Sequence, residues 1–549
     1  MTLAVRLALA LVAIVAIAGL GGALLLARIS TEPAEALGPP QFVEEAAAAG
    51  LEHAYDGEFQ FLVGGGVAVL DCDEDGRPDL FLAGGSEPAA LFRNTSSIGG
   101  SLAVERLASP ATDLEAVTGA YPLDIDGDGI GDLAVLRVGE DVLLRGTGDC
   151  GFERANERWS FDGGDRWSTA FSATWESESD LPTLAIGHYL DRGDPDRSTC
   201  DGHALFRPAG GNSYAKPIPL EPGWCALSML FSDWDGSGRH DLRVSNDRHY
   251  YRNGEEQLWR VEPGAEPEPW TEDEGWRTVR IWGMGIASRD LDGDGMPEVY
   301  LTSQGDNKLQ TLAAGPGRPE YADIALRRGA TAHRPYEGDT TLPSTAWHPE
   351  FADVNNDGFV DLFVSKGNVE AQVDHAMRDP SNLLLGQPDG NFIESAPAAG
   401  LASFVSSRGA ALADLNLDGL LDLVIVHRRE NVSLYRNLGG ATDSTGEPMG
   451  HWLAVRPRQE GANRDAVGAW IEVRAGATTW RVERTVGGGH ASGQLGWTHI
   501  GLGPAERAEV RVIWPDGEEG PWQAVDADRW AVIDRETGLE VWTPGAESD

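Results

Sequence analysis

Carboxylates at alternating positions mark the stretch 290–298, which reads DLDGDGMPE. It follows the pattern D-x-D-x-D-G-x-x-[DE], whose first three acids, Asp290, Asp292 and Asp294, aim hard oxygen ligands at one point. Gly295 permits a sharp turn that a side chain would hinder. Oxygen ligands at this density suit Ca²⁺, so the stretch predicts a calcium-binding loop.

The same nine-residue cassette occurs six times. It begins at positions 71, 124, 233, 290, 353 and 414. The third copy has Ser237 at its fifth position, and the last two have Asn355 and Asn416 at their third. The interval from position 124 to position 233 is close to twice each of the others, which indicates a seventh unit without a proper loop.

Short apolar runs flank each cassette. VAVL at 67–70 precedes the first copy and LFLA at 80–83 follows it, as GIA at 285–287 and VYLT at 299–302 flank the fourth. Runs of β-branched and aromatic residues bounded by glycine are typical of strands. Units of about four strands bury their faces only against neighbours, so this repeat predicts an all-β chain with a seven-bladed β-propeller.

The hidden unit lies between the second and third cassettes. We place its strand at 183–190 (TLAIGHYL) and its loop at 191–197 (DRGDPDR), which is acidic but out of register. This loop is therefore predicted to be degenerate and to hold no Ca²⁺.

The pattern changes after the last cassette. Apolar and polar residues alternate in four stretches, at 451–456, 469–474, 479–484 and 508–513. This alternation is typical of half-buried antiparallel strands. The glycines at 487–489 and the PDG at 515–517 are predicted turns. The sequence thus predicts four parts: a hydrophobic segment at 1–30, a linker at 31–41, the propeller at 42–445 and a small antiparallel β domain at 450–545.

An uncharged run, from Leu7 to Ala27, precedes these domains. A helix needs about 20 apolar residues to cross a bilayer core, whereas a signal peptide has an apolar region of about 7–15. The length of the run favours an uncleaved N-terminal membrane helix. Arg6 before it and several acids after it predict an extracytoplasmic body, in the periplasm or at the cell surface. The alternative is a cleaved signal peptide and a secreted body, with AEA at 34–36 as the cleavage signal.

The chain of 549 residues carries a net charge of −44. An acidic surface repels phosphates and anionic lipids, so we expect no nucleic acid partner, and membrane contact only through the N-terminal helix. The four cysteines form no C-x-x-C pair, which argues against a zinc or redox site. Cys200 and Cys225 could form a disulfide, with Cys150 as a rival partner, whereas Cys72 is expected to be a small, semi-buried thiol.

Two regions resemble known modules. The stretches 66–85 (GVAVLDCDEDGRPDLFLAGG) and 409–426 (GAALADLNLDGLLDLVIV) resemble the FG-GAP/VCBS repeat of integrin-alpha-like propellers. NRD at 463–465, HIGLG at 499–503 and VIWPDG at 512–517 resemble the ASPIC/UnbV domain. The pairing is similar to the CRTAC1-like family over about residues 42–545, although the stretch 486–497 (VGGGHASGQLGW) departs from the usual ASPIC/UnbV sequence.

The resemblance implies that the loops join neighbouring strands on one face of the ring. It also implies that the first, third, fifth and ninth residues of each cassette supply side-chain oxygens and the seventh supplies its carbonyl. The resulting candidate ligands for up to six Ca²⁺ ions are Asp71, Asp73, Asp75, Arg77, Asp79, Asp124, Asp126, Asp128, Ile130, Asp132, Asp233, Asp235, Ser237, Arg239, Asp241, Asp290, Asp292, Asp294, Met296, Glu298, Asp353, Asn355, Asp357, Phe359, Asp361, Asp414, Asn416, Asp418, Leu420 and Asp422.

Two alternatives to a propeller calcium site share its acidic residues. An EF-hand shares the acidic start but needs a bidentate glutamate at position twelve and helical flanks. The twelfth residues are all apolar, which excludes the EF-hand: Leu82, Val135, Val244, Leu301, Val364 and Ile425. The other alternative, an acidic turn without an ion, would leave each loop strongly self-repelling.

Catalytic motifs are missing from the sequence: it contains no H-E-x-x-H, no G-x-S-x-G and no P-loop. Gly283 and Gly285 are interpreted as strand packing, Trp282 as a core residue, and the scattered histidines as structural. We therefore predict no catalytic residues and a binding, adhesion or assembly module with structural Ca²⁺, whose ligand is a protein or carbohydrate bound on the propeller loops.

An alternative function is a polysaccharide lyase or hydrolase on a calcium-bearing propeller. Its sugar platform would be the aromatic-rich insert at 140–222, with Trp159, Trp167, Trp175 and Tyr189. The other interpretation of this insert is a long loop that packs its own aromatic side chains.

Overall fold

The computed structural model describes residues 35–176, 179–247, 254–338, 340–440 and 449–545. From Ala36 onward the chain forms one compact unit. Its described helices are the short α2 (Ala46–Ala49) and α4 (Ala325–Arg328) and the 3-10 turns η1 (Phe59–Phe61) and η2 (Glu272–Glu274). No helix of these ranges is long and apolar enough to cross a membrane, and the predicted membrane helix at 7–27 lies outside them.

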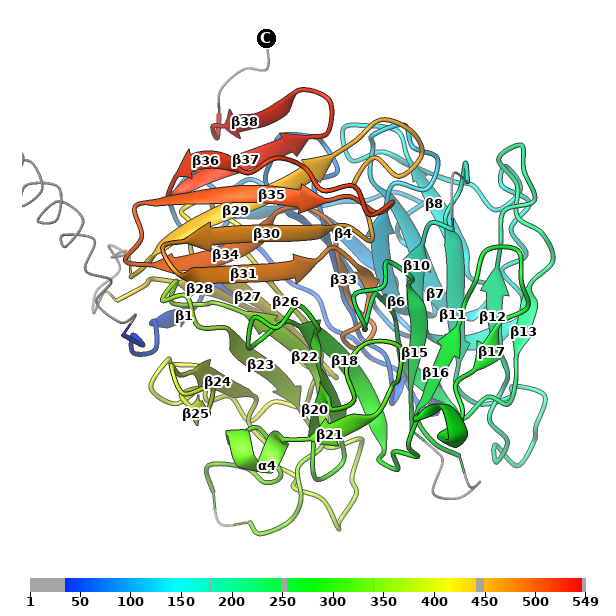
Figure 1. Ribbon diagram of the computed structural model, residues 1–549. Coiled ribbons are helices and arrows are strands. Elements are labelled where there is room, and N and C mark those ends of the chain that lie inside the picture. Colours follow the sequence, from blue (N-terminus) through cyan, green and yellow to red (C-terminus); the bar gives the residue numbers. More distant parts are fainter. Residues whose placement is uncertain (1–34, 177–178, 248–253, 339, 441–448, 546–549) are drawn as a thin grey trace, which may run out of the picture. The chain divides into compact units, whose positions relative to one another are not determined.

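Seven antiparallel units of four strands follow one another and form the blades of a propeller (Figure 1). The first four blades consist of β2 (Val67–Leu70), β3 (Asp79–Leu82), β4 (Ala90–Asn94) and β5 (Val104–Leu107); β6 (Val117–Leu123), β7 (Asp132–Gly139), β8 (Val142–Gly146) and β9 (Phe152–Arg154); β10 (Arg166–Thr174), β11 (Thr183–His188), β12 (His203–Phe206) and β13 (Ile218–Leu220); and β14 (Ala226–Ser232), β15 (Asp241–Asn246), β16 (Gln257–Arg260) and β17 (Glu268–Pro269).

The last three blades complete a closed ring. They consist of β18 (Gly283–Arg289), β19 (Glu298–Ser303), β20 (Lys308–Leu312) and β21 (Tyr321–Asp323); β22 (Ala346–Ala352), β23 (Asp361–Lys366), β24 (Asn382–Gly386) and β25 (Phe392–Glu394); and β26 (Ser407–Ala413), β27 (Asp422–His427), β28 (Ser433–Asn437) and β1 (Phe42–Glu44). Strand β1 comes from the N-terminal side and pairs with β28, Phe42 opposite Asn437.

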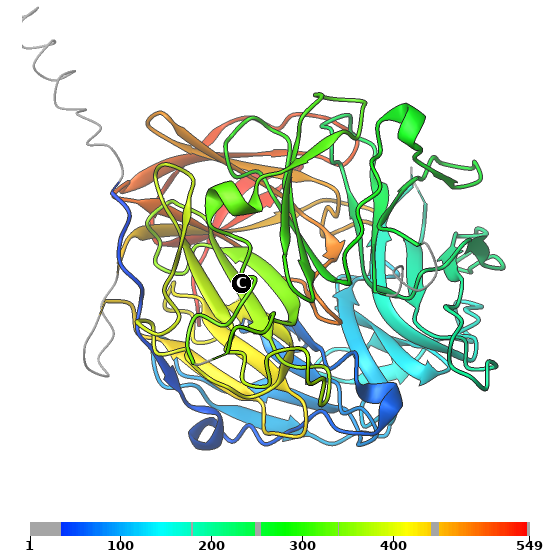
Figure 2. The same ribbon diagram turned by 90° about the horizontal axis from the view of Figure 1, so that it is seen from below.

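The first strand of each blade lies beside the first strand of the next, from β2 around to β26 and back to β2 (Figure 2). The pairing of β1 with β28 and the contact of β26 with β2 leave no open end in the ring. The predicted all-β fold and the seven-bladed propeller are therefore confirmed.

The second strands of the blades are buried on both faces, because neighbouring blades pack against each of them. All six residues of β19 and all six of β27 are buried. Between the sixth and seventh blades, Phe363, Leu412 and Tyr435 belong to one hydrophobic cluster. This two-sided burial explains why the strands occur in the sequence as uninterrupted apolar runs.

The third blade differs from the prediction. The strand expected at 183–190 is β11, the second strand of the blade, whereas the first is β10. The connection equivalent to a cassette is therefore 175–182, and the acidic stretch 191–197 lies between β11 and β12. The prediction was wrong because Trp175 and Thr183 stand where the other blades have their first and ninth acids.

Two sheets follow the ring in the C-terminal region. One has the order β34 (Thr498–Gly503), β29 (His451–Arg458), β37 (Arg529–Asp534) and β38 (Gly538–Trp542), and the other β31 (Thr478–Glu483), β30 (Trp470–Ala475), β35 (Arg507–Ile513) and β36 (Gln523–Asp526). All pairs are antiparallel except β29 with β37, which is parallel. The sheets enclose a core that includes Leu453, Ile471 and Val510. The four strands predicted in this region correspond to β29, β30, β31 and β35.

Both disulfides connect neighbouring blades. Cys200 and Cys225 are bonded, as one predicted pairing had it, and link the third blade to the start of the fourth. Cys72 is bonded to Cys150, so the expectation of a free thiol at Cys72 was wrong. The partners are 78 residues apart, and only the side-by-side packing of the first two blades brings the cassette of one next to the β8–β9 turn of the other.

Candidate calcium sites

Each cassette is the connection from the first to the second strand of its blade. Asp290, for example, directly follows β18, and Glu298 is the first residue of β19. The glycine at the sixth position has φ between +80° and +89° in all six copies, a conformation that favours glycine. Its amide donates a hydrogen bond of 2.8–3.1 Å to the first aspartate of the same loop in every copy. The six sequences thus fold into the same turn.

The ninth acid ties three strands of a blade together. In the first blade, the Asp79 carboxylate accepts hydrogen bonds from the amides of Cys72 (2.8 Å) and Asn94 (2.7 Å). Asp132, Asp361 and Asp422 accept an equivalent pair of amide hydrogen bonds in their own blades. This acid therefore has a structural role in the blade besides any role as a ligand.

Carboxylate oxygens converge within 4.8 Å of one another in three of the cassettes. In the first two blades the first, third and ninth acids converge, and in the fifth blade the first, third and fifth. The groups are Asp71 with Asp73 and Asp79, Asp124 with Asp126 and Asp132, and Asp290 with Asp292 and Asp294. Three carboxylates around one point form an oxygen-rich site of the kind that Ca²⁺ prefers.

Several of these oxygens are buried without a hydrogen-bond partner. They include Oδ1 of Asp71, Asp124, Asp126 and Asp233 and Oδ1 of Asn416. Burial raises the pKa of Asp71 to about 6 and that of Asp124 to about 7. Buried acceptors that lack a donor and lie beside other carboxylates are costly unless a cation neutralises them, so the residues present fit a hard divalent ion.

Arginine side chains already contact some of the predicted ligands. Arg93 lies 3.1 Å from Asp73, and Arg145 lies 2.7 Å from Asp126 and also contacts Asp128. The carboxylates of the 290–298 loop have no such ion pair within the described part of the chain. Of the three converging groups, this is the one whose carboxylates form no ion pair with a described residue. Burial raises the pKa of Asp290, and Arg481, which donates to the Gly295 carbonyl, lowers it from a distance.

The fourth-blade cassette is engaged differently. Both Trp234 and Trp270 donate an indole hydrogen bond of 2.9 Å to Asp241, and Arg239 forms an ion pair of 2.9 Å with the same carboxylate. Asp235 accepts a hydrogen bond from the Gly317 amide in the neighbouring blade. This copy, which has Ser237 in place of an acid, is not among the converging groups.

In the sixth and seventh blades an amide replaces the third acid. Asn355 Nδ2 donates to Asp357 (3.1 Å), and Asn416 Nδ2 donates to Asp418 (3.0 Å). Burial, together with the neighbouring fifth-position acid, raises the pKa of Asp353 and of Asp414 to about 8. A neutral ligand reduces the charge of these two loops, yet the first aspartate remains buried beside a second acid.

The C-terminal sheets cover the face on which the cassettes lie (Figure 1). The side chains of Trp542, Trp452 and Trp480 lie against the sixth-position glycines of the first, seventh and sixth blades, and no space is left there for a Cβ atom at Gly76 or Gly419. Indole and guanidinium groups donate to loop carbonyls, as Trp480 does to Gly358 (2.8 Å) and Arg481 to Gly295 (3.0 Å). The cassettes thus form the docking surface for the C-terminal domain.

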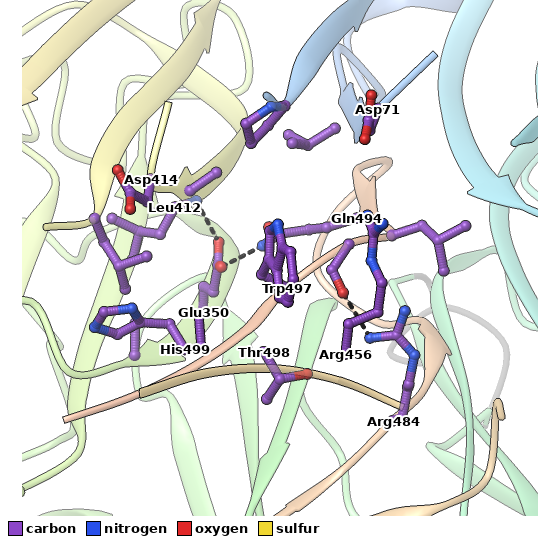
Figure 3. Close-up of a pocket in the computed structure, with 18 of the residues that line it drawn as sticks. Asp71, Glu350, Leu412, Asp414, Arg456, Arg484, Gln494, Trp497, Thr498 and His499 are labelled. Atoms are coloured by element: carbon purple, nitrogen blue, oxygen red, sulfur yellow. Dashed lines mark hydrogen bonds between the residues drawn. The ribbon is translucent and has the colours of Figure 1, made fainter. Parts of the chain in front are cut away.

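A cavity of about 210 Å³ lies at this interface (Figure 3). The propeller contributes acids to its lining, including Asp71, Asp414 and Glu350, and the C-terminal domain contributes Arg456 and Arg484. Arg289 of the propeller and Glu483 of the C-terminal domain line the cavity too, so each domain contributes charges of both signs. Arg456 partly offsets the effect of burial on the pKa of Asp71.

A glycine-rich segment, 485–496, leaves the C-terminal sheets and enters the axis of the ring; we call it the axial finger. Its strand β32 (Val486–Gly487) pairs with β10 and β14, and its strand β33 (Gly493–Gln494) pairs with β2. Between them, the His490 amide donates to His348 (3.0 Å). The prediction of a simple turn at 487–489 was wrong, because Gly487 belongs to β32 and Gly489 pairs with Ile286 of β18. The stretch 486–497, which departs from the usual ASPIC/UnbV sequence, includes most of this segment.

The four aromatic residues of the predicted sugar platform do not lie together. Trp159 is fully buried in a hydrophobic cluster between the second and third blades, and Trp175 packs against the same cluster. Trp167 and Tyr189 contact each other edge to face, with ring centroids 4.9 Å apart, near the axis of the ring. The insert thus uses two of its aromatics as core and presents two at the axis.

Family models match parts of the chain. Residues 459–540 match the family described as ASPIC and UnbV, and residues 71–135 and 290–364 match the FG-GAP-like repeat. Cartilage acidic protein 1 of Mus musculus is 23% identical over 487 residues, 82% of this chain and 70% of that protein. The Homo sapiens protein of the same name is 26% identical over 242 residues, 43% of this chain and 33% of that protein.

Solved structures with similar folds are more distant. The BBS1N chain crystallised with ARL6DN has a TM-score of 0.41 and 12% identity, and covers 72% of this chain and 98% of its own. An Agrocybe aegerita lectin that recognises terminal N-acetylglucosamine has a TM-score of 0.39 and 16% identity, and covers 68% and 91%. The Dos1 propeller has a TM-score of 0.33 and 12% identity, and covers 74% and 96%.

The chain is therefore an FG-GAP-repeat β-propeller that carries an ASPIC and UnbV domain at its C-terminal side. Its similarity to cartilage acidic protein 1 of Mus musculus covers 82% of the chain.

Proposed function

We propose that the protein is an extracytoplasmic binding module whose propeller is stabilised by Ca²⁺ in the cassette loops. The loops face the C-terminal domain, so the opposite face of the ring presents the surface for a protein or carbohydrate ligand. Two disulfides, with no cysteine left unpaired in the described residues, support an oxidising compartment outside the cytoplasm.

One observation carries the calcium proposal. The same turn recurs in six blades, and its first aspartate retains a buried oxygen without a donor at Asp71, Asp124 and Asp233. A group that folding buries without a partner is destabilising unless something else binds it. The predicted fifth-position and seventh-position ligands complete each proposed coordination sphere, with up to six ions per chain.

The ion would also act on the domain arrangement. Because the sixth-position glycines and their carbonyls contact Trp452, Trp480 and Arg481, the shape of the loops determines whether the C-terminal domain fits the ring. Calcium would hold the loops in that shape and lower the negative charge beneath the C-terminal sheets. The proposed role of Ca²⁺ in the protein is thus structural and not catalytic.

The test is thermal unfolding of the purified protein in chelator, followed by titration with Ca²⁺. Open sites of this kind bind at about 10⁻⁴–10⁻³ M, so we expect a saturable rise in Tm on the order of 10 °C by 10 mM Ca²⁺. Mg²⁺ should not replace it, because it requires a smaller octahedral site. An unchanged Tm would show that the cassettes are empty turns and would overturn the proposal.

A single-site variant isolates one loop. Asp290→Asn removes the charge of a converging ligand at the converging group that has no ion pair, and it should lower the unfolding free energy by about 1–3 kcal/mol in Ca²⁺ only. The matched control is Asp196→Asn, which removes one exposed charge outside the cassettes. Equal effects of the two substitutions would argue against a specific ion at 290–298.

The enzyme alternative would require acid and base groups in an open cleft. The first and ninth acids of the cassettes accept hydrogen bonds from backbone amides, and the C-terminal domain packs against several of these loops. Incubation of the protein with a panel of acidic and neutral polysaccharides, with release of reducing or unsaturated ends as the readout, tests this function. We expect no release.

A further inference from the structure

The sixth blade contains a lysine that is completely buried. Only three of the 43 basic residues of the chain are lysines, and the others are arginines. Lys216 is exposed and Lys308 is partly exposed, whereas Lys366, the last residue of β23, is 0% exposed. Fully buried lysines are rare, because a charged ammonium loses its hydration on burial. Unlike an arginine, however, a buried lysine can lose its proton and become a nucleophile.

The Lys366 amine faces the carboxyl group of Asp379. Its Nζ lies 3.5 Å from Asp379 Oδ1, and both side chains are 0% exposed. Nζ also donates a hydrogen bond of 2.9 Å to Oγ of Ser344, its other polar contact within the described residues. An ammonium has three N–H donors, so a charged Lys366 is incompletely satisfied in this fully buried site.

An ion pair at this position is costly. Burial lowers the pKa of the Lys366 amine and raises the pKa of the Asp379 carboxyl, and each group partly offsets the effect of burial on the other. The attraction within a buried pair compensates for the lost hydration only where the geometry is close and the remaining donors are satisfied. A neutral amine beside a neutral carboxylic acid avoids this cost, and so does the amide that the two can form.

The segment before β22 contacts both groups. The Ser344 hydroxyl donates to Asp379 Oδ1 (2.9 Å), and the Thr345 amide donates to Asp379 Oδ2 (2.9 Å). Because Ser344 Oγ also accepts from Nζ, it can take up a proton from the amine while it passes its own proton to Oδ1. The Thr345 amide polarises the carbonyl bond to Oδ2 and stabilises charge that develops there.

A second acid of the blade is held by other groups. Glu394, the last residue of β25, accepts hydrogen bonds from the Asn382 side chain and from the Ala396 amide (2.9 Å). Its charge raises the pKa of Lys366, but the ion pair of Lys366 within the described residues is with Asp379. Asp379 is therefore the carboxyl group in contact with the amine.

We propose that Lys366 and Asp379 become joined by an intramolecular isopeptide bond. The ammonium first transfers a proton to the carboxylate. The neutral amine then attacks Cγ, a C–N bond forms, and the bond from Cγ to Oδ1 breaks. The proton of the acid and a second proton from Nζ, passed on by Ser344, both end on Oδ1, which leaves as water. The reaction needs no oxidant, metal or further reactant, because folding holds the two groups together.

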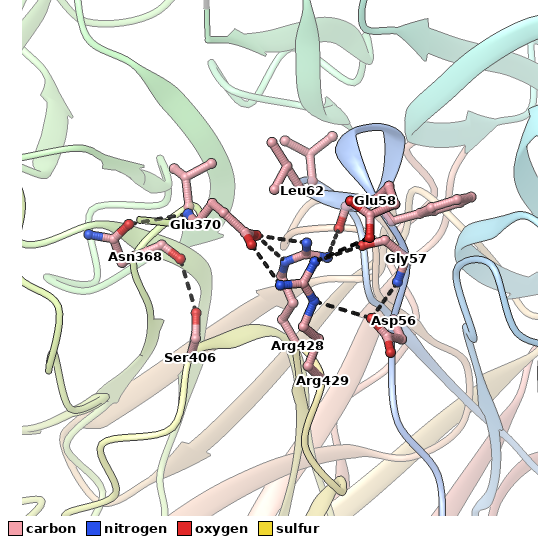
Figure 4. A network of polar contacts seen from close by, with 12 residues as sticks. Asp56, Gly57, Glu58, Leu62, Asn368, Glu370, Ser406, Arg428 and Arg429 are labelled. Atoms are coloured by element: carbon pink, nitrogen blue, oxygen red, sulfur yellow. Dashed lines mark hydrogen bonds and ion pairs between the residues drawn. The ribbon is translucent and has the colours of Figure 1, made fainter. Parts of the chain in front are cut away.

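The bond would fix a connection on the face opposite the cassettes, which goes beyond the proposed binding function. Residues 367–381 connect β23 to β24 and leave β23 at the end away from its cassette. The first part of this connection is held to the last blade, where Glu370 accepts hydrogen bonds from Arg428 (2.9 Å) and Arg429 (2.7 Å) (Figure 4). The Lys366–Asp379 bond would close most of it into a covalent loop.

The experiment is peptide mapping by tandem mass spectrometry of the full chain, which is unfolded and reduced before digestion with trypsin. We expect no cleavage after Lys366, and a joined peptide that is lighter than its sequence by one water molecule and whose fragments place the bond between Lys366 and Asp379. Asp379 precedes Pro380, which has no N–H, so a succinimide cannot account for the lost water.

The chain provides its own control. Lys308 lies 3.1 Å from Asp323, closer than Lys366 lies to Asp379, but both side chains are partly exposed. In contact with water this pair remains charged, so trypsin should cleave after Lys308 and the peptides should have their sequence masses.

Variants assign the roles of the three residues. Lys366→Arg retains the positive charge but removes the nucleophile, and Asp379→Ala removes the acceptor, so each should abolish the joined peptide. Ser344→Ala should lower the joined fraction by about tenfold or more, because the proton then lacks its path to Oδ1. The matched control, Lys308→Arg, should leave the joined fraction unchanged.

The wild-type chain decides the proposal even where a variant fails to fold. Complete cleavage after Lys366, with both peptides at their sequence masses, would overturn it and leave an ordinary buried ion pair. The masses are read from unfolded peptides and need neither Ca²⁺ nor a ligand. Failure here therefore leaves the calcium proposal standing, and an unchanged Tm in the calcium titration does not alter this result.

Discussion

The third blade and the six cassette blades stabilise the connection between their first two strands in different ways. In a cassette blade, acids bend the connection between the first two strands and the ninth acid ties it to the third strand. In the third blade the equivalent connection instead buries Leu181, which is 0% exposed in a hydrophobic cluster with Trp159 and Phe171. The Cys200–Cys225 disulfide and the pairing of β10 with the axial finger add further links.

The difference shows that the propeller geometry does not require an ion in every blade. A connection can be held by hydrophobic burial or by oxygen ligands, and the two respond to different conditions. A connection stabilised by hydrophobic burial should not respond to a chelator, whereas a connection whose carboxylates face one another should lose stability when the bound cation is removed.

The largest expected effect is a split between blades in hydrogen exchange. Chelation should raise amide exchange in the β18–β19 hairpin by on the order of tenfold or more, because opening of that loop becomes easier. The β10–β11 hairpin should change little, since no acid of a cassette supports it. Mass spectrometry of peptides in chelator and in Ca²⁺ measures both, and a uniform response of all seven blades would contradict the comparison.

A substitution in the third blade should cause a large loss of stability that does not depend on calcium. Leu181→Ala removes a fully buried side chain and should cost about 2–5 kcal/mol of unfolding free energy. Urea denaturation should give the same loss in chelator and in Ca²⁺, in contrast to Asp290→Asn. A loss that depends on Ca²⁺ would mean that the connection at 175–182 also depends on the cation.

The smallest expected effect concerns pH. Burial lowers the pKa of His188 to about 4 and of His203 to about 3, so the folded third blade does not take up the protons that the unfolded chain binds below about pH 6.5. Stability should therefore fall as pH is lowered from about 6.5 towards 4, by about 1 kcal/mol per histidine at pH 5.5.

The readout for this pH effect is the slope of unfolding free energy against pH. His203→Gln should make that slope shallower, whatever it does to stability at pH 7.5. The control is His451→Gln, because His451 is part-exposed beside Asp528. An unaltered slope in His203→Gln would place the acid sensitivity outside the third blade.

Local sequence patterns predicted most of the ring. The cassette requires acids and a glycine within one short stretch, so its six copies and their spacing predicted the blade number and the strands on either side. The ring closure by β1 was not predicted, because the register of Phe42 with Asn437 joins the two ends of the propeller sequence. The alternation of apolar and polar residues likewise predicted four C-terminal strands but not where they dock.

Errors arose where a residue's role depends on distant neighbours. Cys72 looked like a free thiol because nothing near it in sequence indicates Cys150. Trp282 looked like core, since an aromatic residue beside a strand is buried more often than not, but in the structure it is only partly buried, where residues of several blades line a cavity. The third blade was misplaced because its connection retained apolar side chains and lost the acids that mark the register.

The sequence by itself determined the repeat: six acidic turns, the strands beside them, the ring of seven and the alternating strands that follow. These features depend on interactions between residues close together in the chain and on a period, both of which a linear pattern records. Only the tertiary structure decided that the C-terminal domain covers the cassettes, that its glycine-rich finger fills the axis, and that aromatic residues from several blades line one cavity. Those features depend on which surfaces pack against one another. The glycines of the finger allow its backbone to approach the backbone of the blades closely, and no spacing of residues along the chain indicates that contact.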